Sequence, residues 1–396
     1  MQTEPRCGPG RPGGRHAGPP GDGTGRVGSR PAPPRPVLLG SAGVRVGLGL
    51  LWLAAGILEL QPADFGAGFA RLDLAQAVMG EPAVVARSIL LALRPFEAAW
   101  PVWNGVVAAV ELGFGAVLVA GGLVALRGGG TGRAARAARW LAGFERPILV
   151  ASALAALVFW WVGEGFGGLP TGFAVPLGGA PGPALLYAFL AVLAWPGPAG
   201  GETVEAWRRT TWRLSWLVVW WGSALAMVSW TLPAAVVLRA NLVENAIGQP
   251  ALLRGWGDAL ASAITRVGAN QVALAVGLVA VAIGLAAVLP LGSTASCLLL
   301  GSGVLLGVLA WVFAQDLGGL ASPGGTDVGL GPPLVLLALA GWPRSASARP
   351  RAAAPEPEAQ PAGPAVRDPR AQPAPPAQPA GRRSMSSIRF PNGSST

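Results

Sequence analysis

The sequence contains no lysine, a single histidine and two cysteines, and charged residues make up only 12% of it. Because His16 stands alone, a histidine-based metal centre, a histidine-ligated haem and a Ser-His-Asp triad are excluded. Cys7 and Cys297 lack the spacing of a redox pair or a structural disulfide. We therefore expect no enzymatic centre, no metal site and no cofactor.

The residues that are present indicate a membrane protein. Apolar types make up 52% of the chain, and all 29 basic residues are arginine. Soluble domains contain about 25% charged residues, twice the share found here. The arginines lie in the tails and in short loops beside apolar segments, so membrane orientation explains them better than nucleic-acid binding does. The expected partner is the lipid bilayer, with no nucleic-acid partner.

Eight hydrophobic segments are predicted to be transmembrane helices. A helix needs about 20 residues to cross about 30 Å of hydrocarbon, and helices satisfy their own backbone hydrogen bonds inside a bilayer. The predicted fold is therefore all-α, an integral membrane bundle of eight transmembrane helices. Their approximate bounds are residues 38–60, 99–126, 146–165, 181–196, 213–232, 268–290, 294–314 and 328–343.

The hydrophobic part of the chain contains an internal repeat. Residues 104–122 return as 270–288 with 7 of 19 positions identical, and residues 160–169 return as 311–320, each ending in Gly-Gly-Leu. Shorter matches in the same order join residues 80–83 to 248–251 and 195–196 to 342–343. Each half holds an even number of spans, so both halves cross in the same direction. The sequence thus predicts two tandem parallel four-helix repeats.

The expected domain organisation follows from these patterns. Residues 1–36 and 344–396 are rich in Gly, Pro, Ala and Arg and are predicted to be disordered tails. Residues 37–197 form the first membrane repeat and residues 198–343 the second. With both termini cytoplasmic, the inner segments carry 22 arginines and the outer segments 6, as the positive-inside rule requires. The expected location is the plasma membrane of a GC-rich bacterium.

The outer segments and the fourth span of each half point to a binding cavity. Residues 83–94 and 251–266 are predicted helices that lie along the membrane surface or cap the bundle. The fourth spans, 183–195 and 332–342, are short and follow Gly/Pro-rich stretches. Short, interrupted spans at matching positions are typical of membrane binding cavities. The alternative is that these glycines and prolines only end one helix and begin the next.

Three glutamates within or at the outer ends of predicted spans are the main candidates for a ligand-binding or proton site: Glu59, Glu111 and Glu164. A charge near the bilayer centre costs about 2.5–3.5 kcal/mol, so such side chains face protein or water. Glu111 is the deepest, and we expect it to be neutral at rest and able to take part in proton transfer. The alternative is a purely structural hydrogen bond, for example to Asn104, which joins the candidates.

In the second half, the positions that align with Glu111 and Glu164 are not acidic. Glu111 aligns with Gly277, and Glu164 aligns with Gln315, which stands beside Asp316. An amide preserves the packing of a carboxyl but does not titrate. Gln315 and Asp316 complete the candidate set, and the first half is expected to be the chemically active copy.

A resemblance adds a ligand class. Each half is a predicted four-span unit with a Gly-rich outer turn. The turn lies in residues 160–169, followed by Gly182-Pro183, and in residues 311–320, followed by Gly331-Pro332. This pattern resembles the DoxX-like membrane proteins, and the whole chain resembles a functionally unassigned class of duplicated multi-pass proteins from GC-rich actinobacteria. DoxX relatives are membrane subunits associated with quinone-linked sulfur oxidation. The resemblance implies a quinone ligand and a membrane redox partner, and it transfers no catalytic residue.

The leading functional expectation is an accessory subunit that binds a quinone or lipid-like ligand in an outer-facing cavity near the three glutamates. A proton-coupled small-molecule transporter is the first alternative, and a structural partner in an envelope complex is the second. A ligand-binding subunit should keep its ligand when Glu111 becomes Gln, whereas proton-coupled flux should collapse.

Overall fold

The structure is a computed structural model. It describes residues 39–66, 77–127, 132–171, 174, 178–197, 202–228, 239–240, 242–243, 250–289, 293–320 and 325–343. The predicted tails, residues 1–36 and 344–396, lie outside the described residues, as does the end of the fifth predicted span.

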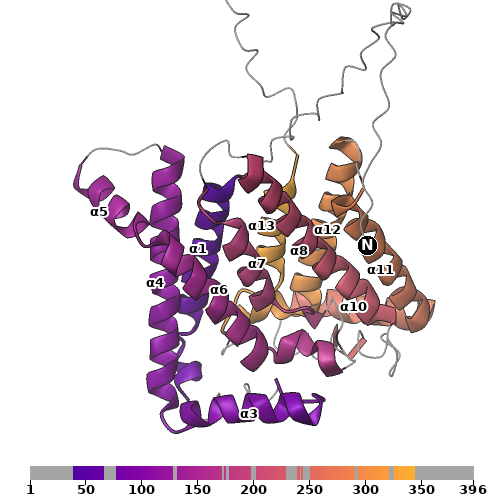
Figure 1. The fold of residues 1–396 in the computed structure, drawn as a ribbon. Coiled ribbons are helices and arrows are strands. Elements are labelled where there is room, and N and C mark those ends of the chain that lie inside the picture. The colour runs from indigo at the N-terminus through magenta and orange to yellow at the C-terminus, as the bar shows by residue number, and fades with distance from the viewer. Residues whose placement is uncertain are drawn as a thin grey trace, which may run out of the picture. The chain divides into compact units, whose positions relative to one another are not determined.

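The described residues fold into helices without any β-strand, which confirms the all-α prediction (Figure 1). The α-helices of the first half are α1 (Ser41–Leu58), α3 (Ala83–Glu97), α4 (Trp100–Arg127), α5 (Arg133–Ala142), α6 (Glu145–Val162) and α7 (Pro183–Leu193). Those of the second half are α8 (Glu202–Val228), α10 (Ala251–Val267), α11 (Ala269–Gly284), α12 (Ser293–Ala314) and α13 (Gly331–Gly341). Short 3₁₀ helices are η1 (Pro62–Phe65), η2 (Gly165–Thr171), η4 (Leu285–Ala287) and η5 (Asp316–Gly319).

Five helical segments of the described chain are long and apolar enough to cross a membrane. They are Ser41–Leu58, Trp100–Arg127, Glu145–Val162, Asn270–Ala287 and Thr294–Ala314. Large apolar side chains on these helices face outward, including Ile57, Leu154 and Leu305, which are about 60% exposed. A soluble protein rarely leaves so much apolar surface uncovered. The protein is therefore embedded in a membrane and crosses it several times.

The other three predicted spans also coincide with helices, but these do not meet the same measure of length and composition. α7 and α13 have 11 residues each. α8 has 27 residues, but its first turns carry Glu205, Arg208, Arg209 and Arg213. These polar turns extend α8 beyond the apolar stretch from which the span was predicted.

The two short helices lie at the centre of the bundle (Figure 1). α7 contacts α1, α6, α8 and α13, and α13 also contacts α1, α8 and α12. Leu186 and Leu190 on α7 and Leu337 on α13 are completely buried. A helix that is apolar on all sides is stable when other helices surround it. Protein rather than lipid therefore covers α7 and α13, so they can be shorter than the outer helices.

Glycines bring α1 and α4 into close contact. A Cβ atom placed on Gly49 would lie 2.8 Å from the backbone nitrogen of Val119, and one on Gly115 would lie 2.7 Å from the carbonyl oxygen of Gly49. Gly56 and Gly122 approach the facing backbone in the same way. Small residues allow helix backbones to approach closely in membranes. This contact fixes the position of α4 relative to the end of α1.

α3 lies crosswise under one end of the bundle, which we call the α3 end (Figure 1). Trp161 on α6 donates a hydrogen bond from Nε1 to Ser88 Oγ on α3 at 3.0 Å, and Ile89 and Leu93 turn inward. Helices begin directly after Pro82 and Pro250, where residues 83–94 and 251–266 were predicted to be helical. α3 therefore covers the ends of α4 and α6.

An ion pair between the buried Arg45 and the partly buried Glu145 joins α1 and α6 toward the opposite end. Arg45 Nη1 lies 2.9 Å from Glu145 Oε2, and the two side chains are 5% and 12% exposed. Gly121 on α4 makes room for the pair, because a Cβ there would collide with the Glu145 carboxyl. The pair fixes the start of α6 against α1.

Candidate functional site

Three of the predicted acids, Glu59, Glu111 and Glu164, line one cavity at the α3 end, together with Asn104. We call it the acid cavity. Its volume is about 330 Å³, which is within the usual range of small-molecule sites, about 300–1,000 Å³. Residues of α1, α3, α4, α6 and α7 form its sides, with Thr326 and Asp327 from the second half.

One face of α4 places two of these side chains. Asn104, Ala108, Glu111 and Gly115 are three or four residues apart and all are buried, so they share one helix face. Asn104 donates from Nδ2 to the backbone carbonyl of Glu59 at 2.8 Å, which satisfies a carbonyl at the end of α1. No hydrogen bond joins Asn104 to Glu111 in the described structure, so the suggested structural pairing is replaced by this contact.

Glu164 follows α6 in a tight turn. Phe166, Gly167 and Gly168 have φ values of 57°, 64° and 69°, a region that glycine occupies readily. A Cβ on Gly167 would collide with the backbone of Pro181. Trp160 donates to the Pro181 carbonyl at 2.6 Å. The turn thus brings the carboxyl of Glu164 to the start of α7, where Oε1 accepts from the Ala184 N–H at 2.8 Å.

The same geometry recurs around Gln315. Leu317 and Gly318 have φ values of 56° and 71°, and Trp311 donates to the Val328 carbonyl at 2.8 Å. Gln315 Oε1 accepts from the Leu330 N–H at 3.1 Å. Gln315 does not line the acid cavity, and the side chain of Asp316 lies outside what the structure describes. An amide therefore serves as well as a carboxyl for this helix-start contact.

A loop of the second half reaches the acid cavity. Gln61, just after α1, donates to the Gly325 carbonyl at 3.0 Å, and Thr326 and Asp327 follow in the cavity lining. Asp327 Oδ1 accepts from the Gly329 N–H at 2.5 Å. Asp327 was not among the site residues predicted from the sequence, although it is the sole acidic residue from 317 to 343. Its place in the Gly/Pro-rich stretch before a short span was the available signal.

Aromatic side chains pack together in part of the cavity lining. Trp52 contacts Tyr187 edge-on with ring centroids 4.8 Å apart and Phe159 at 6.2 Å. Trp52 donates to Ser152 Oγ at 2.8 Å, which fixes its ring. Tyr187 was also missed, although it is the one tyrosine of the sequence and lies on a short central helix. The cavity lining thus combines aromatic rings with acidic side chains.

Polar atoms in this lining lack protein partners. Glu59 Oε2, Asn104 Oδ1, Glu111 Oε2, Glu164 Oε2 and the Tyr187 hydroxyl are buried and make no hydrogen bond. Buried polar atoms are nearly always paired with protein, water or ligand. Five such atoms in one cavity indicate a place for a polar partner.

Burial raises the pKa of two carboxyls of the cavity that lie outside the membrane helices, Glu59 and Asp327. Glu59 is the first residue after α1, and burial, with the nearby Asp64 and Asp327 carboxyls, raises its pKa to about 8. Burial also raises the pKa of Asp327, although the hydrogen bond from Gly329 acts in the opposite direction. At neutral pH, Glu59 is therefore mostly a neutral carboxylic acid that donates one hydrogen bond.

We expect the protein to be more stable at pH 5 than at pH 8.5. A carboxyl whose pKa is about 8 when folded and about 4.3 when unfolded binds more protons in the folded state, so stability falls as pH rises between these values. The contribution of Glu59 is up to about 1.4 kcal/mol per pH unit. Thermal unfolding in nanodiscs measures this slope, and Glu59→Gln should reduce it.

The control is Glu97→Gln, because Glu97 is exposed on α3 and does not line the cavity. Asp327, whose pKa burial also raises, should keep part of the slope. An equal slope in wild type and Glu59→Gln would contradict the assignment.

Comparison with protein-family models, curated proteins and solved structures found no match for this chain.

Proposed function

We propose that the protein is a membrane accessory subunit that binds a quinone or lipid-like ligand in the acid cavity. The observation that carries the proposal is the set of five buried, unpaired polar atoms around one cavity whose lining includes aromatic rings. A flat ring can pack against Trp52 and Tyr187, while its carbonyl oxygens accept from neutral carboxyls and from the tyrosine hydroxyl. The quinone itself is suggested by the resemblance to DoxX-like proteins.

We further propose that the chain crosses the membrane eight times as two parallel four-helix repeats. The recurring turn after α6 and α12 supports this, because Trp160 and Trp311, and also Glu164 and Gln315, make equivalent hydrogen bonds. α8 and α11 pack against each other as α1 and α4 do. The central position of α7 and α13 fits spans that are shorter than the bilayer.

The proposed orientation places the α3 end outside the plasma membrane of a GC-rich bacterium and both termini in the cytoplasm. The arginine-bearing helix α5 and the polar start of α8 then lie on the cytoplasmic side, as the positive-inside rule requires. The acid cavity lies near the outer side in this orientation.

The test of ligand binding is to purify the chain in native-lipid discs and identify the molecules that co-purify. Wild type and Glu111→Gln should both enrich the same ligand relative to bulk membrane, because an amide still donates a hydrogen bond. Glu111→Leu should lose at least about tenfold of that enrichment, since it removes a buried polar contact. Glu97→Gln is the matched surface control. Extracts that equal bulk membrane for wild type would contradict the proposal and favour a structural role in an envelope complex.

A proton-coupled transporter is the second candidate, favoured by the sign of the cavity. The ionisable groups of its lining are Glu59, Glu111, Glu164, Tyr187 and Asp327, with no arginine among them. When its carboxyls are ionised, such a lining attracts protons or small organic cations. Proton flux in liposomes separates the two candidates: a transporter loses flux in Glu111→Gln, whereas a ligand-binding subunit has no flux to lose and keeps its ligand.

A further inference from the structure

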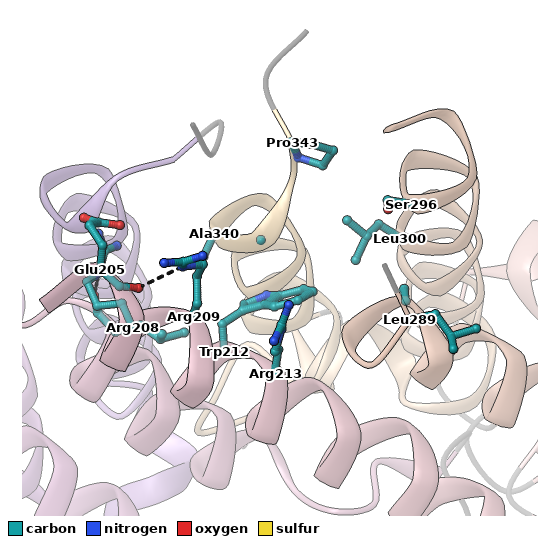
Figure 2. Close-up of a pocket in the computed structure, with 13 residues that line it drawn as sticks. Glu205, Arg208, Arg209, Trp212, Arg213, Leu289, Ser296, Leu300, Ala340 and Pro343 are labelled. Carbon is teal, nitrogen blue, oxygen red and sulfur yellow. Dashed lines mark hydrogen bonds and ion pairs between the residues drawn. The ribbon is translucent and has the colours of Figure 1, made fainter. Parts of the chain in front are cut away.

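A second cavity lies at the opposite end of the bundle from the acid cavity and has a different character. Its volume is about 310 Å³, and the start of α8, the ends of α7 and α13, the start of α12 and the segment around η4 line it. Figure 2 shows Arg209, Trp212 and Arg213 along one side, with Leu289 and Leu300 across from them. We call it the arginine pocket.

The arginine pocket carries a surplus of positive charge. Arg208, Arg209 and Arg213 line it, and Glu205 is the one acidic residue of the lining. The ion pair between Arg208 Nη1 and Glu205 Oε1 is long, at 3.4 Å. Three arginines and one glutamate leave two positive charges without a partner in the pocket. This charge is suited to a dianion or to a monoanion held by two guanidinium groups.

Most guanidinium donors remain available. Arg208 uses Nε to bind the Leu193 carbonyl at 3.2 Å, and Arg209 uses Nε to bind the Glu205 carbonyl at 3.3 Å. These contacts hold the two stems and leave most terminal N–H groups free. Arg213 is exposed and makes no hydrogen bond or ion pair within the described structure. A guanidinium carries five N–H donors, so Arg209 and Arg213 together are equipped to bind phosphate oxygens.

The pocket also has apolar lining, formed by Trp212 beside the arginines and by Leu289 and Leu300 across from them. Trp212 donates to the Leu337 carbonyl at 2.9 Å and stacks on Trp216, which fixes its indole ring. Leu289, which is exposed, and Leu300, which is buried, continue the apolar lining toward α12. An anion-binding side next to an apolar side matches a phospholipid, whose phosphate lies at the interface and whose acyl chain enters the hydrocarbon.

We propose that the arginine pocket binds the phosphate of an anionic phospholipid, with one acyl chain against Leu289 and Leu300. Arg209 and Arg213 contact the phosphate oxygens, and Arg208 supports them from its buried position. The site is separate from the acid cavity and does not depend on the function proposed there. Free inorganic phosphate shares the headgroup chemistry but gains nothing from the apolar side.

The test is native mass spectrometry of the full chain after extraction from vesicles of equal parts phosphatidylcholine and phosphatidylglycerol. Wild type should retain phosphatidylglycerol in preference to phosphatidylcholine. Arg209→Gln/Arg213→Gln should lower that preference by at least about tenfold, because two charge-assisted contacts are lost. Both side chains are exposed, so the fold should persist, and circular dichroism checks this. Arg208 is left unchanged because it is buried against Leu193.

The matched control is Arg133→Gln/Arg136→Gln, which removes two exposed arginines of α5 outside the pocket. This variant should retain the wild-type preference. Equal retention of both lipids by wild type, or equal loss in the two variants, would overturn the proposal. A third arm adds inorganic phosphate to the protein in detergent. Protection from thermal unfolding by phosphate as strong as that by phosphatidylglycerol would assign the pocket to a free anion instead of a lipid.

Discussion

Gly115→Leu should separate α4 from α1 and destabilise the folded protein by about 3 kcal/mol or more, the upper end of the usual cost of overpacking. The reason is that a Cβ at this position would lie 2.7 Å from the carbonyl oxygen of Gly49 and 2.5 Å from Leu53 Cγ. A side chain can change rotamer to make room, whereas the facing backbone of α1 cannot move without shifting the whole helix. Thermal unfolding in nanodiscs measures the loss.

Gly113→Leu is the matched control, since it places the same side chain on the same helix two residues away. Gly113 is exposed, and a Cβ there would meet no atom within 4 Å. This variant should be as stable as wild type or slightly more stable, because leucine favours helix more than glycine does. Equal losses in both variants would mean that helix propensity or insertion, and not the α1–α4 contact, determines the result.

The second large effect concerns the Arg45–Glu145 pair. Removing one partner of a buried ion pair typically costs about 3–5 kcal/mol, because the other charge is left uncompensated. Glu145→Leu should be the more harmful change, since arginine cannot lose its proton in a protein. Arg45→Met should cost less, because an isolated Glu145 can become neutral by taking up a proton.

A double-mutant cycle checks this asymmetry. Arg45→Met/Glu145→Leu should be closer to wild type than Glu145→Leu alone, because an apolar pair can replace a buried ion pair at little cost. Additive losses in the double variant would show that the two side chains act independently, contrary to their 2.9 Å contact.

The sequence predicted much of the candidate site because the relevant signals are local. An acid in an apolar helix is costly wherever it occurs, so Glu59, Glu111 and Glu164 could be selected without a structure, and all three line one cavity. The helices predicted for residues 83–94 and 251–266 are also present, and they begin at Ala83 and Ala251. The repeated Gly-Gly-Leu blocks predicted turns at the ends of α6 and α12, where the structure has them.

What the sequence could not supply is contact between distant segments. Arg45 and Glu145 are 100 residues apart, and neither carries a local sign that it pairs with the other. Asp316 was predicted as a site residue, whereas Asp327 was not. The alignment of the two halves compares equivalent positions and does not reveal a loop that contacts the other half. For the same reason Gln315 was grouped with the cavity acids, although it only caps the start of α13.

The loop that contacts the other half also affects how the protein is made. α1, α4 and α6 leave the ribosome well before residues 325–330, yet Gln61 and the acid cavity use that later segment as part of their surroundings. During synthesis the first half therefore enters the bilayer with one side of its cavity still missing. The cavity lining becomes complete only when translation has passed Asp327. A nascent chain or a product truncated before residue 326 lacks Thr326 and Asp327 and therefore has an incomplete cavity lining.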